Sequence, residues 1–262
     1  MPSWLVFLLS IAVMTFTTPA NAVPLVEDWS SHRSSYDVHA VAPDRFVIEN
    51  HPSVKAAKFT VMSGDRLGNS TGERSEVVLG TWRETSPFRV SGNEGTEYYR
   101  ISVKLDSVWK APEKNAQGYT WGTFFQLHGP DEYRASPAVA LHAEDKFGLF
   151  VLGGDMEKKL GGRRFLTKSD LNLGRWVEFI LAIKWAPDPS GSIAVFRRDA
   201  GESTWEQVAD IKSVATLQYR GSLPPKSHYW KAGFYRSESK HVNSLWLGPI
   251  VRGRTFAEVA GP

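Results

Sequence analysis

The feature that most constrains the fold of this chain is a two-residue alternation of apolar and polar side chains. In YYRISVKL (98–105) every odd-numbered residue from Tyr99 to Leu105 is apolar, and in WVEFILAIKW (176–185) the same holds from Val177 to Trp185. Successive side chains of a strand point to opposite sides, so this pattern is typical of a strand with one buried face. Such segments recur with Gly, Pro, Asn and Asp between them, which predicts an all-β sandwich or barrel.

Other segments extend this prediction. Short strands are expected in residues 146–154, 229–236 and 244–251, and residues 192–211 are expected to form two strands joined by a turn around Gly201. KSVATLQYRG (212–221) is compatible with a short helix. The polar, Gly-containing stretches 111–118 and 153–164 are expected to be loops. No linker divides the chain and no internal repeat is visible, so a single domain is expected.

The amino terminus predicts export. The apolar run from Trp4 to Met14 is too short to span a bilayer, and Ala20-Asn21-Ala22 follows as a small-x-small cleavage site. We expect residues 1–22 to be a secretory signal peptide, although its first residues carry no Lys or Arg. Residues 23–262 would then be one secreted or periplasmic domain. No later segment is long and apolar enough to span a membrane, so no membrane association is expected after cleavage.

Composition narrows the chemistry. The chain has no cysteine, which excludes disulfides and thiolate metal sites and favours a bacterial protein held together by an ordinary core. A net charge of +3 with 10 Trp and 8 Tyr suits an acidic, ring-bearing partner. Nucleic acid is not the expected partner, because its binders usually carry a denser basic patch. The chain is expected to be a monomer.

Three short segments place polar groups side by side on an otherwise apolar strand. In FFQLHG (124–129) Gln126 and His128 share one face, while Phe125 and Leu127 share the other. This arrangement describes either a merely wet sheet face or the floor of a cleft. In GERSEVVLG (72–80), Arg74 shares a face with the glutamate two residues further on, either as a structural ion pair or with the glutamate orienting the arginine.

The third segment is YWKAGFYR (229–236). Tyr229, Lys231, Gly233 and Tyr235 share one face of the expected strand. Gly233 leaves space that a ligand or a neighbouring strand fills. Taken alone, each of the three segments is more commonly explained by a buried tyrosine with one satisfied hydrogen bond or by a surface histidine.

Together these residue types match the needs of β-elimination from a uronate. The C5 proton is barely acidic while the adjacent carboxylate is negative, and an Arg with an amide stabilises the charge that builds up on deprotonation. A His or Tyr then removes the proton, and a Tyr donates to the departing O4. The reaction consumes no water and requires no metal.

RSE at 74–76, QLH at 126–128 and YWKAGFYR at 229–236, in this order, resemble the motifs of the jelly-roll polysaccharide lyases. This superfamily includes alginate lyases, glucuronan lyases and relatives of heparin lyase I. The resemblance implies a concanavalin A-like β-jelly roll of two antiparallel sheets with a concave substrate groove. It also implies that Arg74 and Gln126 neutralise the carboxylate. His128 would be base or charge stabiliser, and Tyr235 would be acid, or both acid and base.

Departures from the alginate lyase pattern bear on the substrate. Val77 and Val78 follow RSE where alginate lyases usually continue with Leu-Arg-Glu, and Arg236 stands where Asn-Gln is common. With the mild net charge, this favours glucuronan or a related glucuronate polymer, followed by heparin, heparan sulfate or alginate. No cofactor is required. Calcium stays open, since some heparin lyase relatives bind it and no EF-hand-like loop occurs here.

Five residues are expected to bind substrate. Lys231 matches the family's motif lysine, in a structural or substrate-binding role, and Tyr229 and Arg236 belong to the same segment. His142, in AVALHAED, either lines the groove or is an ordinary surface histidine. Arg163 belongs to a basic stretch that is either a solvated loop or a cationic rim.

The sequence alone leaves two other functions to consider. A glycoside hydrolase needs two carboxylates across the scissile bond, and Glu76 has no evident partner in the sequence. A non-catalytic, lectin-like carbohydrate-binding module would use the same fold without needing His128 and Tyr235. Serine hydrolase and zinc enzyme motifs are absent.

Overall fold

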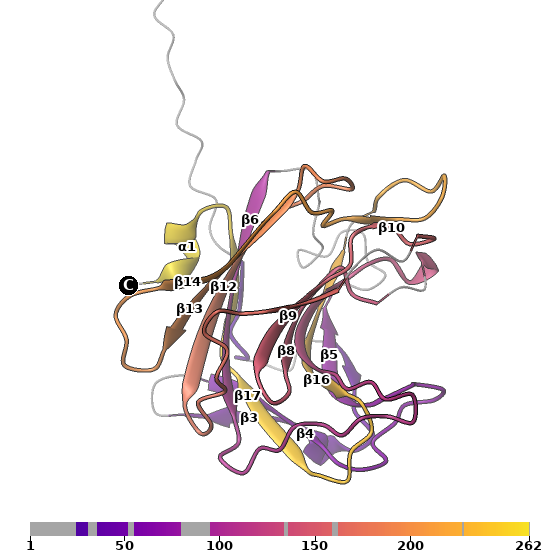
Figure 1. Ribbon diagram of the computed structural model, residues 1–262. Coiled ribbons are helices and arrows are strands. Elements are labelled where there is room, and N and C mark those ends of the chain that lie inside the picture. Colours follow the sequence, from indigo (N-terminus) through magenta and orange to yellow (C-terminus); the bar gives the residue numbers. More distant parts are fainter. Residues whose placement is uncertain are drawn as a thin grey trace, which may run out of the picture.

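The computed structural model describes residues 25–30, 36–51, 55–79, 95–133, 136–158, 162–226 and 228–261, so the expected signal peptide lies outside the described residues. Figure 1 shows two curved antiparallel sheets packed against each other, which confirms the all-β jelly-roll prediction. No helix among the described residues is long and apolar enough to cross a membrane.

The larger sheet has nine strands in the order β14-β13-β12-β6-β17-β4-β3, with β18 paired to β6 and β1 to β18. Its strands are β1 (Leu25–Glu27), β3 (Phe46–Asn50), β4 (Lys55–Val61), β6 (Thr96–Leu105), β12 (Trp176–Lys184), β13 (Ser192–Asp199), β14 (Glu206–Lys212), β17 (Asn243–Leu247) and β18 (Ile250–Gly253).

The smaller sheet has seven strands in the order β11-β9-β8-β7-β16-β5-β2. They are β2 (Tyr36–His39), β5 (Glu73–Leu79), β7 (Gly122–His128), β8 (Val139–Ala143), β9 (Phe147–Val151), β11 (Gly162–Phe165) and β16 (Tyr229–Arg236). The three polar segments of the sequence therefore form adjacent strands: β5 and β7 flank β16.

Short elements complete the fold. The 3-10 turns η1 (Pro43–Arg45) and η2 (Asp131–Tyr133) and the helix α1 (Phe256–Ala260) lie outside the sheets. The proposed helix within 212–221 does not form. Instead β15 (Gln218–Tyr219) pairs in parallel with β10 (Gly154–Asp155), which also gives the loop predicted at 153–164 some strand structure.

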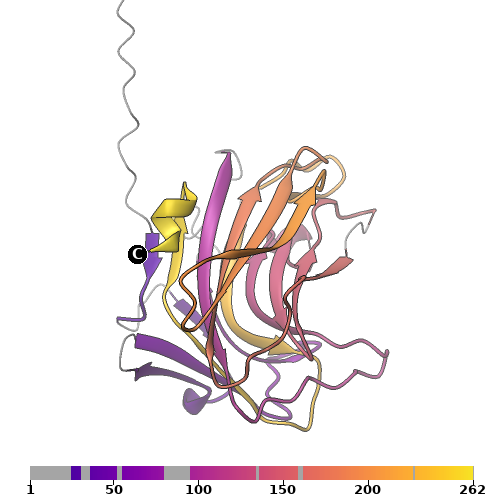
Figure 2. The same cartoon turned by 60° about the vertical axis from the view of Figure 1, so that its left-hand side comes forward.

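The core lies between the two sheets (Figure 2). The alternating residues of β6 and β12 are buried there, as the sequence pattern predicts. From the smaller sheet, Phe125 and Leu127 of β7 and Trp230 and Phe234 of β16 enter the same core. The other face of these strands is thereby left for Gln126, His128, Lys231 and Tyr235, the placement expected from the sequence.

A β-bulge in β7 adjusts this alternation. The pairing with β8 shifts between Thr123 and Phe125, and both Phe124 and Phe125 are buried in the core. A bulge places two successive residues opposite one residue of the partner strand, so the face of each later side chain is reset. Thr123 and Gln126 consequently share the outer face although they are an odd number of residues apart.

Candidate active site

Cross-strand pairing arranges the candidate residues in rows on the outer face of the smaller sheet. Tyr235 of β16 lies opposite Arg74 on β5 and opposite Thr123 on β7, and Thr123 lies opposite His142 on β8. Residues paired directly across strands share a face and have close Cβ atoms. Arg74, Tyr235, Thr123 and His142 therefore form one row, across four adjacent strands.

Glu76 gathers three further side chains of this face. Its carboxylate accepts a hydrogen bond from Arg74 Nη1 at 3.0 Å, from Gln126 Nε2 at 2.9 Å and from Lys231 Nζ at 3.3 Å. His39 Nδ1 of β2 lies 3.8 Å from the same carboxylate. The glutamate that the sequence left without a partner thus connects β2, β5, β7 and β16.

Glu76 is ionised in this environment. Its side chain is only 2% exposed, and burial alone would raise the pKa of its carboxyl group. Lys231, His39 and Arg74 outweigh burial and lower this pKa to about 2. Arg74 and Lys231 together carry two positive charges against one on Glu76, so the cluster keeps a net positive charge. A carboxylate-bearing ligand is electrostatically suited to such a site.

Arg74 and Tyr235 are held against each other. The guanidinium carbon of Arg74 lies 4.1 Å from the centre of the Tyr235 ring, a cation–π contact. Arg74 Nη2 donates to Ser70 Oγ at 2.6 Å, and the Tyr235 hydroxyl lies 3.0 Å from Thr71 Oγ1. Arg74 Nε is buried and has no hydrogen-bond partner among the described residues.

A groove of about 450 Å³ opens beside this row. Gln126, Tyr235 and His142 contribute to its wall. Arg74, Lys231 and His128 are not among the described residues that line it. The other lining residues are Thr71, Asn115, Tyr119, Thr120, Trp121, Thr123, Ser136, Pro137 and Phe150.

His142 is oriented by its neighbours within the groove. Its Nδ1 lies 3.3 Å from Glu144 Oε1, and its Nε2 lies 3.3 Å from Thr123 Oγ1. Its ring stacks on Phe150 at 5.9 Å between ring centres. A carboxylate can only accept, so Nδ1 carries hydrogen in the neutral ring and Nε2 is the basic nitrogen. The structure thus places His142 in the groove, one of the two positions that the sequence left open.

His128 lies elsewhere on the same face. It pairs with Tyr229 at the far end of β7, five residues from Thr123, which is about 15 Å along a strand. Its Nδ1 lies 2.7 Å from the Gly129 carbonyl and its ring lies 5.1 Å from that of Tyr229. The expectation that His128 converges with Arg74 and Tyr235 is therefore not met. The spacing of QLH fixes only the face of His128, not its row.

The residues expected to bind substrate lie in different surroundings. Lys231 is mostly buried against Glu76, and Tyr229 is only 2% exposed beside His128, and neither is among the described residues that line the groove. Arg236 is fully buried and bonds Glu73 through Nε at 3.0 Å, so the structure places it away from the groove. Arg163 lies opposite Phe150 in the pairing of β11 with β9, and its side chain is outside the described residues.

Gly233 is explained by the neighbouring strand. Its φ is +139°, and a Cβ atom there would lie 2.4 Å from the Ser75 carbonyl oxygen and 2.9 Å from Glu76 Cβ. Of the two alternatives for this space, strand β5 fills it, not a ligand. The missing side chain also lets Glu76 and Gln126 reach each other across β16.

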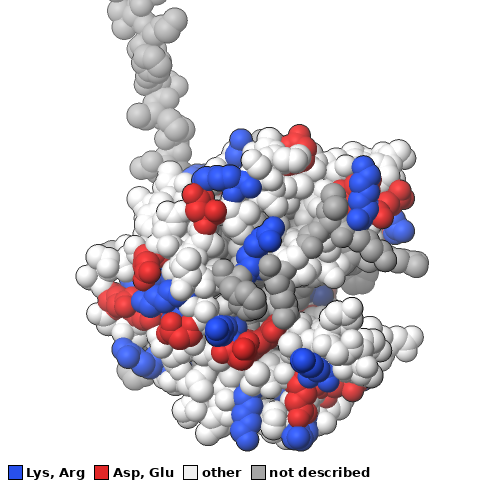
Figure 3. All heavy atoms as spheres, viewed as in Figure 1, with Lys and Arg blue, Asp and Glu red and all other residues white. Residues whose placement is uncertain are grey.

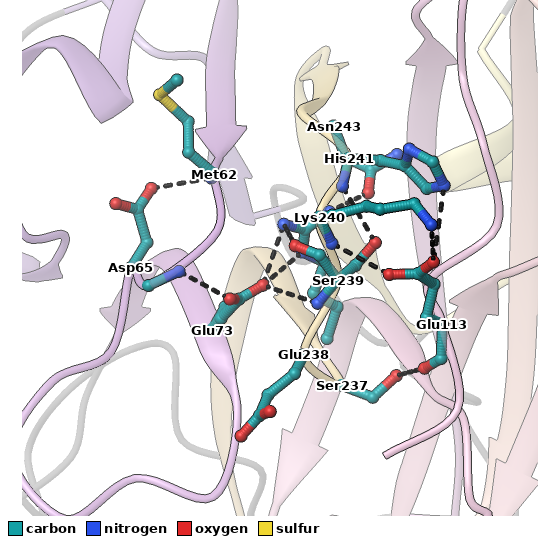
Figure 4. Close-up of polar contacts among 12 residues, drawn as sticks. Met62, Asp65, Glu73, Glu113, Ser237, Glu238, Ser239, Lys240, His241 and Asn243 are labelled. Carbon is teal, nitrogen blue, oxygen red and sulfur yellow. Dashed lines mark hydrogen bonds and ion pairs between the residues drawn. The ribbon is translucent and has the colours of Figure 1, made fainter.

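The segment between β6 and β7 forms one wall of the groove and is tied to the turn after β16. Glu113 Oε1 and Oε2 contact Lys240 Nζ and the Lys240 backbone N–H, each at 3.0 Å, and Ser237 Oγ donates to the Glu113 carbonyl at 2.7 Å (Figure 4). Nearby, Glu73 accepts from the Ser239 N–H at 3.2 Å. These contacts hold Tyr119 and Trp121 beside Tyr235, whose ring is 5.9 Å from that of Trp121.

The described surface is mixed in charge. Figure 3 shows Lys and Arg interspersed with Asp and Glu on the face in view. Among the described residues, no group of three or more His, Asp or Glu is placed to hold a metal ion. Calcium binding stays open, as in the sequence analysis.

This fold and site define a carbohydrate-active enzyme of the jelly-roll class. The polysaccharide lyase family profile matches residues 27–250, and the chain belongs to this family. No curated protein matches the sequence.

Solved structures share the fold. An endo-β-1,4-glucuronan lyase from the fungus Trichoderma reesei has a TM-score of 0.56 at 17% identity, over 90% of this chain and 92% of that one. Alginate lyase Aly36B, bound to an alginate trisaccharide, has a TM-score of 0.57 at 10% identity, over 90% and 100%. The exolytic family 7 alginate lyase AlyA5 from Zobellia galactanivorans has a TM-score of 0.54 at 11% identity, over 82% and 89%.

Proposed function

We propose that this polysaccharide lyase cleaves a uronic-acid polymer by β-elimination, with glucuronan or a related glucuronate polymer as its substrate. The observation that carries the proposal is the row of Arg74, Tyr235, Thr123 and His142 beside the cluster that Glu76 organises. An amide, a phenol and an imidazole then line one groove, and the arginine is paired with the phenol beside them. The departures from the alginate lyase motifs favour glucuronate.

Each side chain has a role in this proposal. Arg74 and the second N–H of Gln126 bind the uronate carboxylate and stabilise the charge that develops on it. His142 Nε2 takes the C5 proton, and the electron pair of the C5–H bond forms the C4–C5 double bond. The C4–O4 bond breaks, and Tyr235 donates its hydroxyl proton to O4. His128, which the sequence suggested as the base, lies too far along β7 for this step.

Export is part of the same proposal. A secreted or periplasmic enzyme meets a polymer that is too large to enter a cell, and the apolar run from Trp4 to Met14 followed by Ala20-Asn21-Ala22 supports export.

Ultraviolet absorbance tests the reaction directly, because each cut creates a C4–C5 double bond. The mature protein is mixed separately with glucuronan, alginate, heparin, heparan sulfate and hyaluronan. We expect absorbance to rise with glucuronan, and His142→Asn to slow it by roughly a hundredfold or more. His128→Asn is the matched variant and keeps most of the rate. A rise on another polymer reassigns the substrate, and equal losses in both variants overturn the role of His142.

A further inference from the structure

A row of alternating lysines and tryptophans crosses the outer face of the larger sheet, on the opposite side of the core from the groove. Trp246 of β17 pairs with Lys58 of β4 and with Lys104 of β6, and Lys104 pairs with Trp176 of β12. Figures 1 and 2 show these strands side by side. The four side chains, called here the back strip, are partly exposed.

The back strip is held in shape by contacts among its members. Lys104 Nζ lies 4.5 Å from the centre of the Trp246 ring and 5.6 Å from that of Trp176. Lys58 Nζ lies 5.1 Å from the centre of the Trp246 ring. Trp246 Nε1 donates to Glu49 Oε2 at 2.7 Å, which fixes the orientation of its indole. The lysines and indoles thus alternate in a fixed order.

Packing in the core does not explain this arrangement, although the His51 ring lies edge-on to both indoles at 5.8 and 6.3 Å between ring centres. Trp176 and Trp246 project away from the core that their own strands help to build, whereas their neighbours Val177 and Leu247 enter it. Large aromatic side chains gathered on an outer face mark an interaction site more often than isolated exposed residues do.

The charge and spacing of the back strip select a ligand. Lys58 Nζ lies 3.6 Å from Glu49 Oε1. Lys58 and Lys104 carry two positive charges against one negative charge on Glu49, so the strip has a net positive charge. The two tryptophans are two strands apart, about 10 Å, a length comparable to that of a disaccharide. Indoles pack against the C–H faces of sugar rings, and ammonium groups pair with carboxylates.

We propose that the back strip is a second binding site for a polyuronate chain, separate from the groove. This proposal rests on the proposed function for the identity of the polymer. A chain held here keeps the enzyme on its substrate, or holds a neighbouring strand, while the groove acts. Because the two sites lie on opposite sheets, a short oligosaccharide in the groove does not reach the strip.

Binding to glucuronan tests this proposal in a groove-disabled background, Arg74→Ala with Tyr235→Phe. We expect this protein to keep measurable affinity for the polymer, and Lys58→Gln with Lys104→Gln to weaken it by roughly three- to tenfold, more at low salt. Lys184→Gln is the matched control, since Lys184 is exposed on the same face of β12. Trp176→Ala removes one indole without changing charge and is expected to weaken binding similarly.

Activity separates this proposal from the lyase assignment. With the groove intact, the Lys58→Gln, Lys104→Gln protein is expected to cleave a short oligouronate at the unsubstituted rate and the polymer more slowly at low concentration. Unchanged polymer affinity in the lysine and Trp176 variants overturns the back strip, whatever the activity. An absence of cleavage by the unsubstituted protein, with strip-dependent binding, overturns the lyase proposal and leaves the strip standing.

Discussion

Gln126 donates a hydrogen bond to Glu76 across an intervening strand. Gln126 lies on β7 and Glu76 on β5, and their side chains meet at 2.9 Å over β16. Strands are about 4.8 Å apart, so residues two strands away rarely touch. Gly233 allows the contact because it places no side chain between them. The geometry of the cluster around Glu76 therefore depends on a residue that has no side chain.

Gly233→Ala tests this dependence. An alanine would have to adopt a φ of +139° and place its Cβ against the backbone of β5, so we expect a loss of roughly 2–4 kcal/mol in the free energy of unfolding. Chemical denaturation measures it. Gly162→Ala is the control, because a Cβ atom at Gly162 meets nothing within 4 Å. Equal stability of the two variants would show that β5 moves aside easily.

Glu76→Gln is expected to change the activity and also the way the free energy of unfolding falls at acid pH. The pKa of Glu76 is lowered from 4.5 to about 2, so the carboxylate stabilises the fold above pH 4.5 and this contribution is lost as the pH falls toward 2. The contribution is roughly 3 kcal/mol. We expect the variant to be less stable at pH 7 and to show a flatter profile between pH 4.5 and 2. Parallel profiles for both proteins would contradict an ionised Glu76.

His228 makes a second contribution to the free energy of unfolding that is lost at acid pH. Burial, followed by the nearby His128 ring, lowers the pKa of its imidazole from 6.5 to about 3. The unfolded chain then binds a proton more readily than the folded one, so stability is complete above pH 6.5 and declines as the pH falls toward 3. His228 stacks on Trp185 at 5.3 Å, and His228→Phe keeps this packing. Thermal unfolding of the variant is expected to depend less on pH in that window.

Glu113→Ala is expected to loosen the groove wall. The substitution removes both contacts with Lys240 that tie this wall to the turn after β16. We expect KM to rise by roughly two- to fivefold with kcat nearly unchanged, since the wall borders the groove and holds none of the residues proposed to transfer a proton. Glu132→Ala, which removes an ion pair with Lys226, is the control. A fall in kcat alone would place the wall in the chemical step.

The sequence predicted the strands and their faces well. Alternation in β6, β12 and β16 identified the buried residues, and the three motifs identified adjacent strands of one sheet. The same alternation places Arg236 on the face of Trp230 and Phe234, which predicts a buried side chain and not the substrate contact expected from its place in the motif.

The rows across the sheet could not be predicted. They depend on strand register, and the pairing of β16 with β7 shifts between Ala232 and Tyr235 while that of β7 with β8 shifts between Thr123 and Phe125. These shifts bring His142, not His128, into the row of Tyr235. The link from Glu76 to Gln126 likewise joins residues 50 positions apart, which spacing along one strand does not reveal.

The most direct test compares binding and turnover of glucuronan in Tyr235→Phe, with Tyr98→Phe on the larger sheet as the control. Removing one hydroxyl from the groove leaves the cluster around Glu76 in place. We expect Tyr235→Phe to bind oligoglucuronate within about threefold of the unsubstituted affinity and to form unsaturated ends at least roughly a hundredfold more slowly, while Tyr98→Phe changes neither. Undiminished formation of unsaturated ends by Tyr235→Phe would contradict the account.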